Sequence, residues 1–356
     1  MFNFNKLLAL VLAVPFVVAA PGKRALPAIC QRLEPVAADL LENLFGGECG
    51  DSAHGALRLI FHDAIGISPI VGGGGADGSI VTFNATELTF EANDGLDDVI
   101  ADVGPFFLKH QDVITSGDFV QLAGALSLAA CPGAPRVQFF AGREPPKAPS
   151  PNFLVPEPFN TTDQIIERFA QVGFEPHEIV ALLSSHSIAG ADTVDPTIPG
   201  TPFDTTPSVY DTNIFIDVLL KGTLFPGTAG NQGELMTAVN GTLRLQSDFE
   251  IAHDPRTACT WQEFATNQPL MASKFGPAVL KLSFLGQDPE RLTDCSELIP
   301  QPPALKDVPE FPPGQFLSDI QASCDVARFP DLPTQPGPPL DVAPIPQADS
   351  DDEDDS

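Results

Sequence analysis

The chain has 356 residues, of which 43% are hydrophobic, and its formal net charge is −29. That apolar content is enough for the core of one large domain or of two closely packed halves. The charge excludes nucleic acid and an anionic membrane surface as partners, and it favours solubility in an acidic medium.

The N-terminal residues predict secretion. Residues 1–19 contain a short apolar run that ends in small residues, which is typical of a signal peptide and too short to span a bilayer. Residues 20–24 end in Lys23-Arg24, so we expect a short propeptide with a second cleavage there. We therefore expect a secreted, extracellular monomer with no membrane-spanning segment.

Six cysteines predict three disulfides in an oxidising compartment. They are Cys30, Cys49, Cys131, Cys259, Cys295 and Cys324. About 15 pairings are possible, and spacing alone does not choose among them. Three glycosylation sequons, which begin at Asn84, Asn160 and Asn240, agree with secretion.

Helical periodicity dominates most of the chain. The apolar stripes over residues 34–64 predict two helices that are broken at Gly46-Gly47. The same kind of pattern recurs at residues 96–111, 117–130, 161–172, 176–190, 212–221 and 260–285. Because strand-like alternation is scarce, we predict a mainly α fold with little β structure and long ordered loops.

The C-terminal part of the chain differs in composition. Residues 301–348 are rich in proline, which excludes a continuous helix, so we expect an extension that wraps the surface and is pinned at Cys324. Residues 349–356 are mostly acidic and contain no apolar residue, which predicts a disordered tail.

Arg58 and His62 form the first candidate catalytic pair. Residues four apart on a helix share one face, and Phe61 with the apolar stripe beneath favours a partly buried cavity over a surface pair. Cleavage of a peroxide needs a base that moves a proton between two oxygens and a cation beside the leaving oxygen. His62 can supply the base and Arg58 the cation. We expect Asn93 to accept a hydrogen bond from the far nitrogen of His62, and Glu87 to orient Asn93.

A second histidine, His186, lies in a separate apolar helix. Such a histidine is often a satisfied core residue. As an iron ligand it needs a carboxylate on its other ring nitrogen, and Asp248 is our candidate. One histidine that binds iron and another that acts on the bound oxidant together indicate a haem.

Two oxygen-rich loops, one beside each histidine helix, predict calcium sites. The distal site would combine Asp63, the carbonyl of Gly75, Asp77 and Ser79. The proximal site would combine Ser187, Asp204, Thr206, the carbonyl of Val209, and Asp211. A flexible glycine loop is the alternative for the first, and that run lacks the spacing and the lysine of a phosphate-binding loop.

The chain resembles the secreted fungal class II haem peroxidases, which belong to the plant, fungal and bacterial peroxidase superfamily. The resemblance runs from about residue 28 to residue 330, and is carried by RLIFHDAI, GGGGADGSI, LLSSHSIAGAD, PFDTTPSVYD, LKGTLFPG and RLQSDFEIAHDPRTACTWQ. It implies a helical two-domain fold with a distal half (25–160), a proximal half (161–300), haem b between them and two structural calcium ions.

The same resemblance implies residue roles. It gives distal catalytic positions to Arg58, Phe61, His62 and Asn93, and it makes His186 the haem-iron ligand with Phe203 and Asp248 beside it. The disulfides that it implies are Cys30–Cys295, Cys49–Cys131 and Cys259–Cys324. The chain lacks a fourth bridge that the family usually has near its N-terminus.

The sequence specifies the electron donor less clearly than it specifies the haem site. Lignin and versatile peroxidases carry a surface tryptophan where this chain has Ala181, while Trp261 matches another position and Tyr210 lies among the calcium ligands. We therefore expect no long-range radical route.

Manganese peroxidases bind Mn²⁺ through three acids and a haem propionate, and the matching positions here are Asp51, Gly55 and Asp192. Two carboxylates and a propionate still offer the hard oxygen ligands that manganese prefers. The chain is therefore most similar to an atypical manganese peroxidase that uses H₂O₂, Mn²⁺ and small organic chelators, with a role in degrading lignin and aromatic compounds.

Two other interpretations stay open. In the first, a generic low-potential peroxidase oxidises phenols and dyes directly at the haem edge, and Asp51 and Asp192 are ordinary solvated acids. In the second, the protein is a non-catalytic, calcium-stabilised haem carrier, which requires Arg58 and His62 to be idle.

Overall fold

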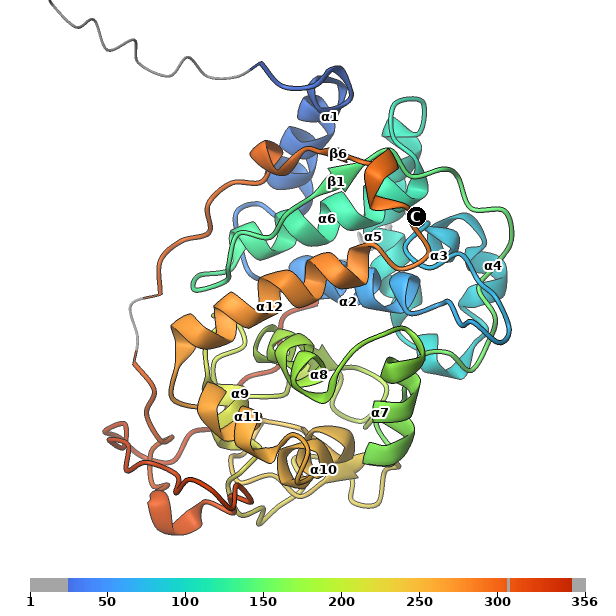
Figure 1. Ribbon diagram of the computed structural model, residues 1–356. Coiled ribbons are helices and arrows are strands. Elements are labelled where there is room, and N and C mark those ends of the chain that lie inside the picture. The colour runs from blue at the N-terminus through green and yellow to red at the C-terminus, as the bar shows by residue number, and fades with distance from the viewer. Residues whose placement is uncertain (1–24, 306–307, 348–356) are drawn as a thin grey trace, which may run out of the picture.

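The structure is a computed structural model that describes residues 25–305 and 308–347 (Figure 1). The predicted signal peptide (1–19), propeptide (20–24) and acidic tail (349–356) lie outside the described residues. Within the two described stretches the fold is mainly helical with little β structure, which confirms the predicted class. No helix in these stretches is both long and apolar enough to cross a membrane.

Twelve α-helices are the main regular elements of the described chain. They are α1 (Ala28–Asp39), α2 (Asp51–Ala64), α3 (Ser79–Thr82), α4 (Asn84–Glu87), α5 (Leu96–His110), α6 (Ser116–Ala130), α7 (Thr162–Gln171), α8 (Pro176–Leu183), α9 (Asn213–Asp217), α10 (Gln246–His253), α11 (Ala258–Phe264) and α12 (Gln268–Ser283). One π-helical turn, η1 (Leu40–Leu44), and five 3-10 turns, η2 (Glu91–Asn93), η3 (Ser184–Ile188), η4 (Pro289–Arg291), η5 (Ser296–Leu298) and η6 (Leu317–Asp319), join them. Three two-stranded antiparallel sheets pair β1 (Phe140–Ala141) with β6 (Thr293–Asp294), β2 (Gly190–Ala191) with β3 (Thr201–Pro202), and β4 (Glu234–Leu235) with β5 (Arg244–Leu245).

Most of the predicted helices are present, although they begin and end at other residues than predicted. Gly46 and Gly47 interrupt the first predicted stretch, since their φ angles of 58° and 77° suit glycine and end a helix. The helical pattern at residues 260–285 corresponds to two helices and not to one. That stretch forms α11 and α12, because the side-chain oxygen of Asn267 accepts a hydrogen bond from the backbone N of Leu270 and starts a new helix.

The helices form two groups, which meet where α12 packs against α2. Figure 1 shows α1 to α6 in the upper part and α7 to α11 in the lower part, with α12 crossing beside α2. Helix α2 packs against α5 and α6, and α12 packs against both α8 and α2. The helix that carries Arg58 and His62 therefore lies close to the α8–η3 segment that carries His186.

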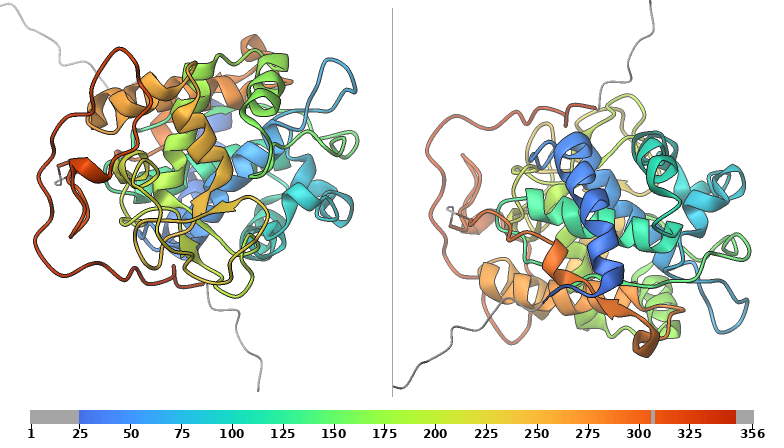
Figure 2. Two further views of the ribbon diagram at one scale, coloured as in Figure 1. Left: turned by 90° about the horizontal axis from the view of Figure 1, so that it is seen from below. Right: turned by 90° about the horizontal axis from the view of Figure 1, so that it is seen from above.

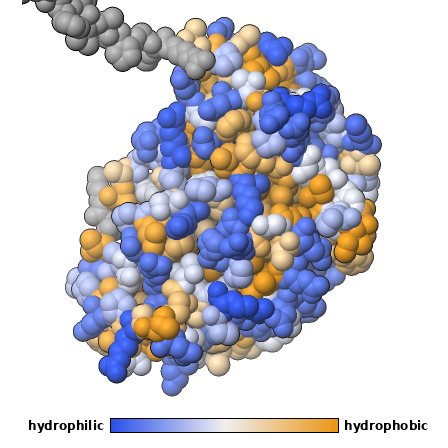
Figure 3. Space-filling view, in the orientation of Figure 1, coloured by the Kyte–Doolittle hydropathy of each residue, from blue (hydrophilic) through white to orange (hydrophobic). Residues whose placement is uncertain are grey.

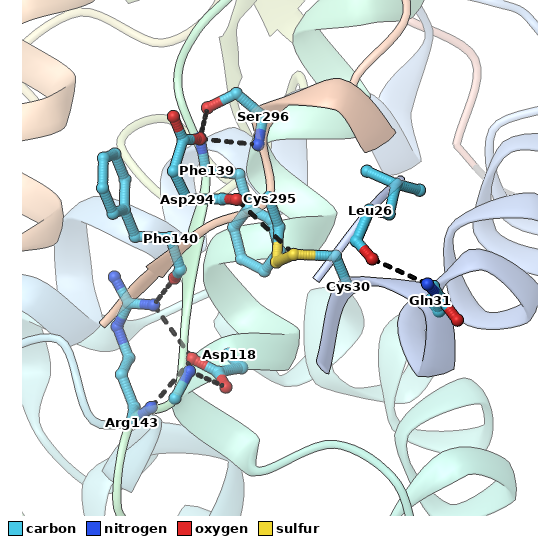
Figure 4. The surroundings of a disulfide bond; sticks show 11 residues. Leu26, Cys30, Gln31, Asp118, Phe139, Phe140, Arg143, Asp294, Cys295 and Ser296 are labelled. Atoms are coloured by element: carbon cyan, nitrogen blue, oxygen red, sulfur yellow. Dashed lines mark hydrogen bonds and ion pairs between the residues drawn. A yellow bond between two sulfur atoms is a disulfide. The ribbon is translucent and has the colours of Figure 1, made fainter. Parts of the chain in front are cut away.

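Three disulfides tie together segments that are distant in sequence. Cys30–Cys295 joins α1 to the residue after β6 (Figure 4), Cys49–Cys131 joins the chain before α2 to the end of α6, and Cys259–Cys324 joins α11 to the C-terminal extension. This is the pairing that the family resemblance implies, and the described chain contains no free cysteine.

The C-terminal extension wraps the lower helices as extended chain, as predicted (Figures 1 and 2). Isolated bridges pair Leu220 with Ile320 and Asn240 with Asp341. Near its end, the backbone N of Ile345 donates to the carbonyl of Gly200 at 2.8 Å. The extension therefore reaches the loop between β2 and β3, which borders the active site described below.

Asp39, the last residue of α1, is a buried carboxylate that fastens α1 to α5. It accepts hydrogen bonds from Lys109 Nζ at 2.9 Å and pairs with His110 Nε2 at 2.7 Å. The hydrogen bond from Lys109, followed by that from His110, lowers the pKa of Asp39 from 3.8 to about 2, although burial acts in the opposite direction. The contact therefore keeps its charge in an acidic medium.

Asp39→Asn should remove a pH-dependent part of the stability. Because the folded-state pKa lies below the unfolded value, the carboxylate stabilises the fold above about pH 4, and this contribution is lost as the pH falls through about 2. We expect calorimetry to show a melting temperature lower by about 3 °C at pH 6 and little changed at pH 2. Asp112→Asn, at an exposed position, is the control. An equal loss for Asp39→Asn at both pH values would contradict the assignment.

Candidate active site

One cavity of about 460 Å³ brings most of the predicted active-site residues together. Its lining includes Arg58, Phe61 and His62 from α2, His186 from η3, and Phe203, the residue after β3. This volume lies in the range of roughly 300–1,000 Å³ that is typical of ligand and cofactor sites. Residues that are far apart in the sequence therefore share one site.

Two hydrogen bonds orient His62. Arg58 Nε donates to His62 Nε2 at 3.2 Å, and His62 Nδ1 lies 2.9 Å from Asn93 Oδ1. An amide oxygen only accepts, so these contacts assign the ring hydrogen to Nδ1 and leave Nε2 unprotonated. Asn93 thus makes the contact that the sequence predicts.

The main chain of Glu87, and not its carboxylate, holds Asn93 in place. Its Nδ2 donates to the backbone carbonyl of Glu87 at 2.9 Å, whereas the Glu87 carboxylate accepts from the backbone N of Ser150 at 2.9 Å. Glu87 therefore orients Asn93 through its main chain, while its buried side chain fixes the loop before α7.

Burial makes His62 a neutral base. The residue is 8% exposed, and burial, followed by the nearby charge of Arg58, lowers its pKa from 6.5 to about 3, against the effect of the Asn93 hydrogen bond. Burial also lowers the pKa of Arg58, while the carboxylates of Asp192 and Asp94 oppose that shift. An uncharged imidazole therefore lies beside a guanidinium group in mildly acidic solution.

His186 lies in η3, which continues α8, and its partner Asp248 lies in α10. His186 Nδ1 and Asp248 Oδ2 are 2.8 Å apart, and Asp248 is fully buried. The Nδ1 hydrogen therefore points to the carboxylate, which leaves Nε2 as the nitrogen that can bind iron. The ring of Phe203 packs beside that of His186, with centroids 5.2 Å apart. These residues fit a haem in the cavity.

The loop that is predicted to bind the distal calcium ion contains a buried carboxylate oxygen without a hydrogen-bond partner. Asp63 is fully buried, its Oδ2 accepts from the backbone N of Gly78 at 2.9 Å, and its Oδ1 has no hydrogen-bond partner. Burial, followed by the charge of Asp77, raises the pKa of Asp63 well above its usual value. Ser79 is also buried, and the carbonyl of Gly75 accepts from the backbone N of Asp77 at 2.7 Å. A buried carboxylate is costly unless it is paired, so these residues fit the predicted calcium ion.

The proximal loop has the same character. Asp204 Oδ2 and Ser187 Oγ are buried and have no hydrogen-bond partner. Burial, followed by Asp211, raises the pKa of Asp204 well above its usual value. A turn in which Val209 N donates to the carbonyl of Thr206 at 3.0 Å connects the two acids. This donor set also fits calcium.

Each of the two loops that are predicted to bind calcium contributes only two carboxylates. Over residues 25–305 and 308–347, no group of three or more His, Cys, Asp or Glu side chains is placed to hold a metal ion. Hydroxyl and carbonyl oxygens would therefore complete both calcium sites. The predicted manganese acids, Asp51 and Asp192, line the cavity together with Gly55, which offers no third carboxylate.

The two acids that are predicted to bind manganese lie beside segments that no sequence pattern connects with them, namely α5 and the C-terminal extension. Asp192 Oδ1 accepts from the backbone N of Gly200 at 2.8 Å and from Gln347 Nε2 at 3.3 Å. A Cβ atom on Gly55 would lie 2.8 Å from Val99 Cγ2, so α5 fills the space beside that glycine. The C-terminal extension and α5 thus limit what can bind there.

Other residues at the site are missed by the sequence reasoning. Glu91, Asp94, Glu157 and Ile345 line the cavity. They lie in the short turn η2, in loops and in the extension, where no periodicity predicts the path of the chain. Near the proximal loop, burial raises the pKa of Asp217 to about 7. Of these four lining residues, only Glu157 has a local sequence signal. It lies between two prolines, which indicates a rigid turn beside the site.

The single Trp and the single Tyr of the chain are both fully buried. Trp261 Nε1 donates to the carbonyl of Phe215 at 3.1 Å, and the Tyr210 hydroxyl lies 2.6 Å from Ser184 Oγ. Neither ring is therefore exposed to a substrate at the surface.

Comparison with known proteins identifies the family. A family model described as Peroxidase matches residues 36–267, and one described as Fungal peroxidase extension region matches residues 270–347. The chain is 49% identical to Manganese peroxidase 3 of Phlebia radiata over 327 residues, which covers 90% of each chain. It is 47% identical to Ligninase LG2 of Phanerodontia chrysosporium over 341 residues (92% of this chain, 91% of the relative). It is 45% identical to Versatile peroxidase VPS1 of Pleurotus eryngii over 339 residues (93% and 91%).

The fold, the cavity and these matches define a haem peroxidase, an oxidoreductase that acts on hydrogen peroxide. The chain belongs to the fungal class II peroxidase family, whose members bind haem b and calcium and are typically secreted. Relatives with three different names match at similar identity, so identity alone does not decide the electron donor.

Removal of calcium should weaken the fold around both histidines. An ion that binds the folded chain and not the unfolded chain stabilises it by mass action, so EDTA should lower the melting temperature of the holoenzyme by about 5–10 °C. Because Asp63 follows His62 and Ser187 follows His186, chelation and mild heating should also change the Soret spectrum. Excess CaCl₂ should reverse the loss of stability. An unchanged melting temperature and Soret band would contradict the calcium assignment.

Proposed function

We propose that this chain is a secreted peroxidase that oxidises Mn²⁺ to Mn³⁺ with hydrogen peroxide. The observation that carries the proposal is that Asp51 and Asp192 line the same cavity as Arg58, His62 and His186. Together with a haem propionate, the two carboxylates would supply the hard oxygen ligands that manganese prefers. The Mn³⁺, chelated by small organic acids, would then act on lignin and other aromatic compounds.

Different residues of this chain would carry out different parts of the reaction. When bound, haem b supplies the iron at which peroxide is reduced and from which one-electron oxidations follow. His62 Nε2 takes the proton from one peroxide oxygen and returns it to the other, and Arg58 stabilises the charge on the leaving oxygen. Asp248 holds the Nδ1 hydrogen of His186 and makes that ring a stronger ligand. In balance, two Mn²⁺, one H₂O₂ and two protons give two Mn³⁺ and two water molecules.

Direct oxidation of phenols and dyes at the haem edge is the second candidate. It is favoured by Gly55, which provides no third carboxylate, and by the two hydrogen bonds that Asp192 Oδ1 accepts. Both of those bonds go to Oδ1, so Oδ2 can still meet a cation. We therefore place manganese oxidation first.

Removal of both acids separates the two candidates. In Asp51→Ala/Asp192→Ala we expect kcat/KM for Mn²⁺ to fall by about 10–100-fold or more, mainly through KM, while oxidation of a small phenol is unchanged. The measurement is steady-state formation of a Mn³⁺–malonate complex over a range of Mn²⁺ concentrations.

A charge-matched control is available for that experiment. Asp112→Ala/Asp325→Ala removes two exposed carboxylates elsewhere and should turn over Mn²⁺ as the wild type does. Wild-type Mn²⁺ kinetics in Asp51→Ala/Asp192→Ala would overturn the manganese proposal and leave the haem-edge candidate.

A further inference from the structure

Two loops carry large hydrophobic side chains into solvent. Ile70 and Val71, in the loop after α2, are 78% and 58% exposed, and Phe153, in the loop before α7, is 87% exposed. Figure 2 shows the two loops projecting at the same end of the molecule. In Figure 3 the projecting right-hand edge, where Figure 1 draws the loop after α2, is coloured as hydrophobic. We call these three residues the loop-tip surface.

Phe153 is held in a strained conformation that turns it outward. With a φ of 66° it is the one non-glycine residue of positive φ among the residues that the structure describes, and bulky side chains rarely adopt this region. Its backbone N donates to Asn152 Oδ1 at 2.7 Å, and the next residue, Leu154, is buried. The fold therefore specifies the exposure of this aromatic ring at an energetic cost.

A buried arginine ties the two loops together. Arg168 of α7 is 9% exposed and has no carboxylate partner among the described residues. Its Nε donates to the carbonyl of Leu154 at 2.7 Å, and its Nη2 donates to the carbonyl of Ile67 at 2.8 Å and to that of Ile65. One guanidinium group thus fixes the bases of both loops.

The loop that carries Ile70 is also internally rigid. Ser68 and Gly72 exchange two backbone hydrogen bonds of 2.8 and 2.9 Å, and Ile70 N donates to Ser68 Oγ at 3.1 Å. At the base of this loop, a Cβ atom on Gly66 would lie 2.3 Å from Ser150 Oγ, so the two loops are in contact. The exposed side chains therefore stand on a preformed support.

Phe153 places one part of the loop-tip surface close to the active-site cavity. Pro156, three residues after Phe153, lines the cavity, and so does Phe169, the residue after Arg168. Three residues of chain span at most about 11 Å, so the Cα atom of Phe153 lies within that distance of the lining.

We propose that Ile70, Val71 and Phe153 form a contact surface that holds an uncharged aromatic polymer close to the cavity. The inference rests on the peroxidase assignment and is independent of the manganese site. The net charge of −29 disfavours an anionic lipid surface as the occupant. A second copy of the chain is disfavoured by size, because a stable interface buries roughly 1,200–2,000 Å² and three side chains at loop tips cannot supply that area. An aromatic polymer needs only repeated weak contacts, and a stacked ring changes a binding equilibrium by about 2–12-fold.

Co-sedimentation of the purified holoenzyme with milled lignin particles tests the proposal, with microcrystalline cellulose as the non-aromatic surface. The variant is Ile70→Ser/Val71→Ser/Phe153→Asn, since asparagine adopts a positive φ readily. We expect its partition to lignin to fall by about tenfold. Its melting temperature and its oxidation of a small phenol should match those of the wild type.

Val326→Ser is the matched control, because Val326 in the C-terminal extension is as exposed as Phe153, at 87%. This variant should bind lignin as the wild type does. Wild-type lignin binding by the triple variant, or an equal loss in Val326→Ser, would overturn the proposal. The binding is measured without peroxide and Mn²⁺, so failure of the manganese proposal would not change the result.

Discussion

The hydrogen bonds on the Nδ1 atoms of His62 and His186 are the interactions on which the active site depends. Asn93 Oδ1 lies 2.9 Å from one Nδ1 and Asp248 Oδ2 lies 2.8 Å from the other, so each ring keeps Nε2 for chemistry. The two partners differ in charge. Burial lowers the pKa of His62 despite its hydrogen bond to a neutral amide, so that ring is a weak base, whereas a buried carboxylate makes His186 a stronger electron donor to a metal. We infer that the same side chain takes two roles because its partners differ.

Neither partner lies in the helix of its histidine, so the loops must be fixed for the rings to be oriented. Asn93 lies in η2 and is held by the main chain of Glu87, whose side chain holds the loop before α7. The residue after each histidine, Asp63 or Ser187, has a buried oxygen without a hydrogen-bond partner, which suits a calcium ion. Calcium binding, loop order and histidine orientation are therefore expected to be lost together. The Cys49–Cys131 disulfide adds a covalent tie between the ends of α2 and α6.

Local sequence patterns were sufficient to predict features that depend only on neighbouring residues, such as a helical face or a helix end. The spacing of Arg58 and His62 predicted their shared helical face, and the glycines at 46 and 47 predicted the break before it. The family resemblance supplied the disulfide pairing and Phe203, which spacing alone could not choose. Helix α10 is too short for periodicity to reveal, and the contact of Gln347 with Asp192 joins residues far apart in the chain. The packing of Val99 against Gly55 depends on how α5 docks on α2, which no local pattern encodes.

The rate of reaction with H₂O₂ tests most directly whether His62 moves protons while His186 holds the iron. Stopped-flow absorbance would follow the resting holoenzyme of His62→Ala after mixing with peroxide. We predict that haem content is retained and that the rate falls by about 10²–10⁴-fold, because the general base is missing. His177→Ala, at an exposed histidine of α8, should keep the wild-type rate. A wild-type rate in His62→Ala would contradict the division of roles between the two histidines.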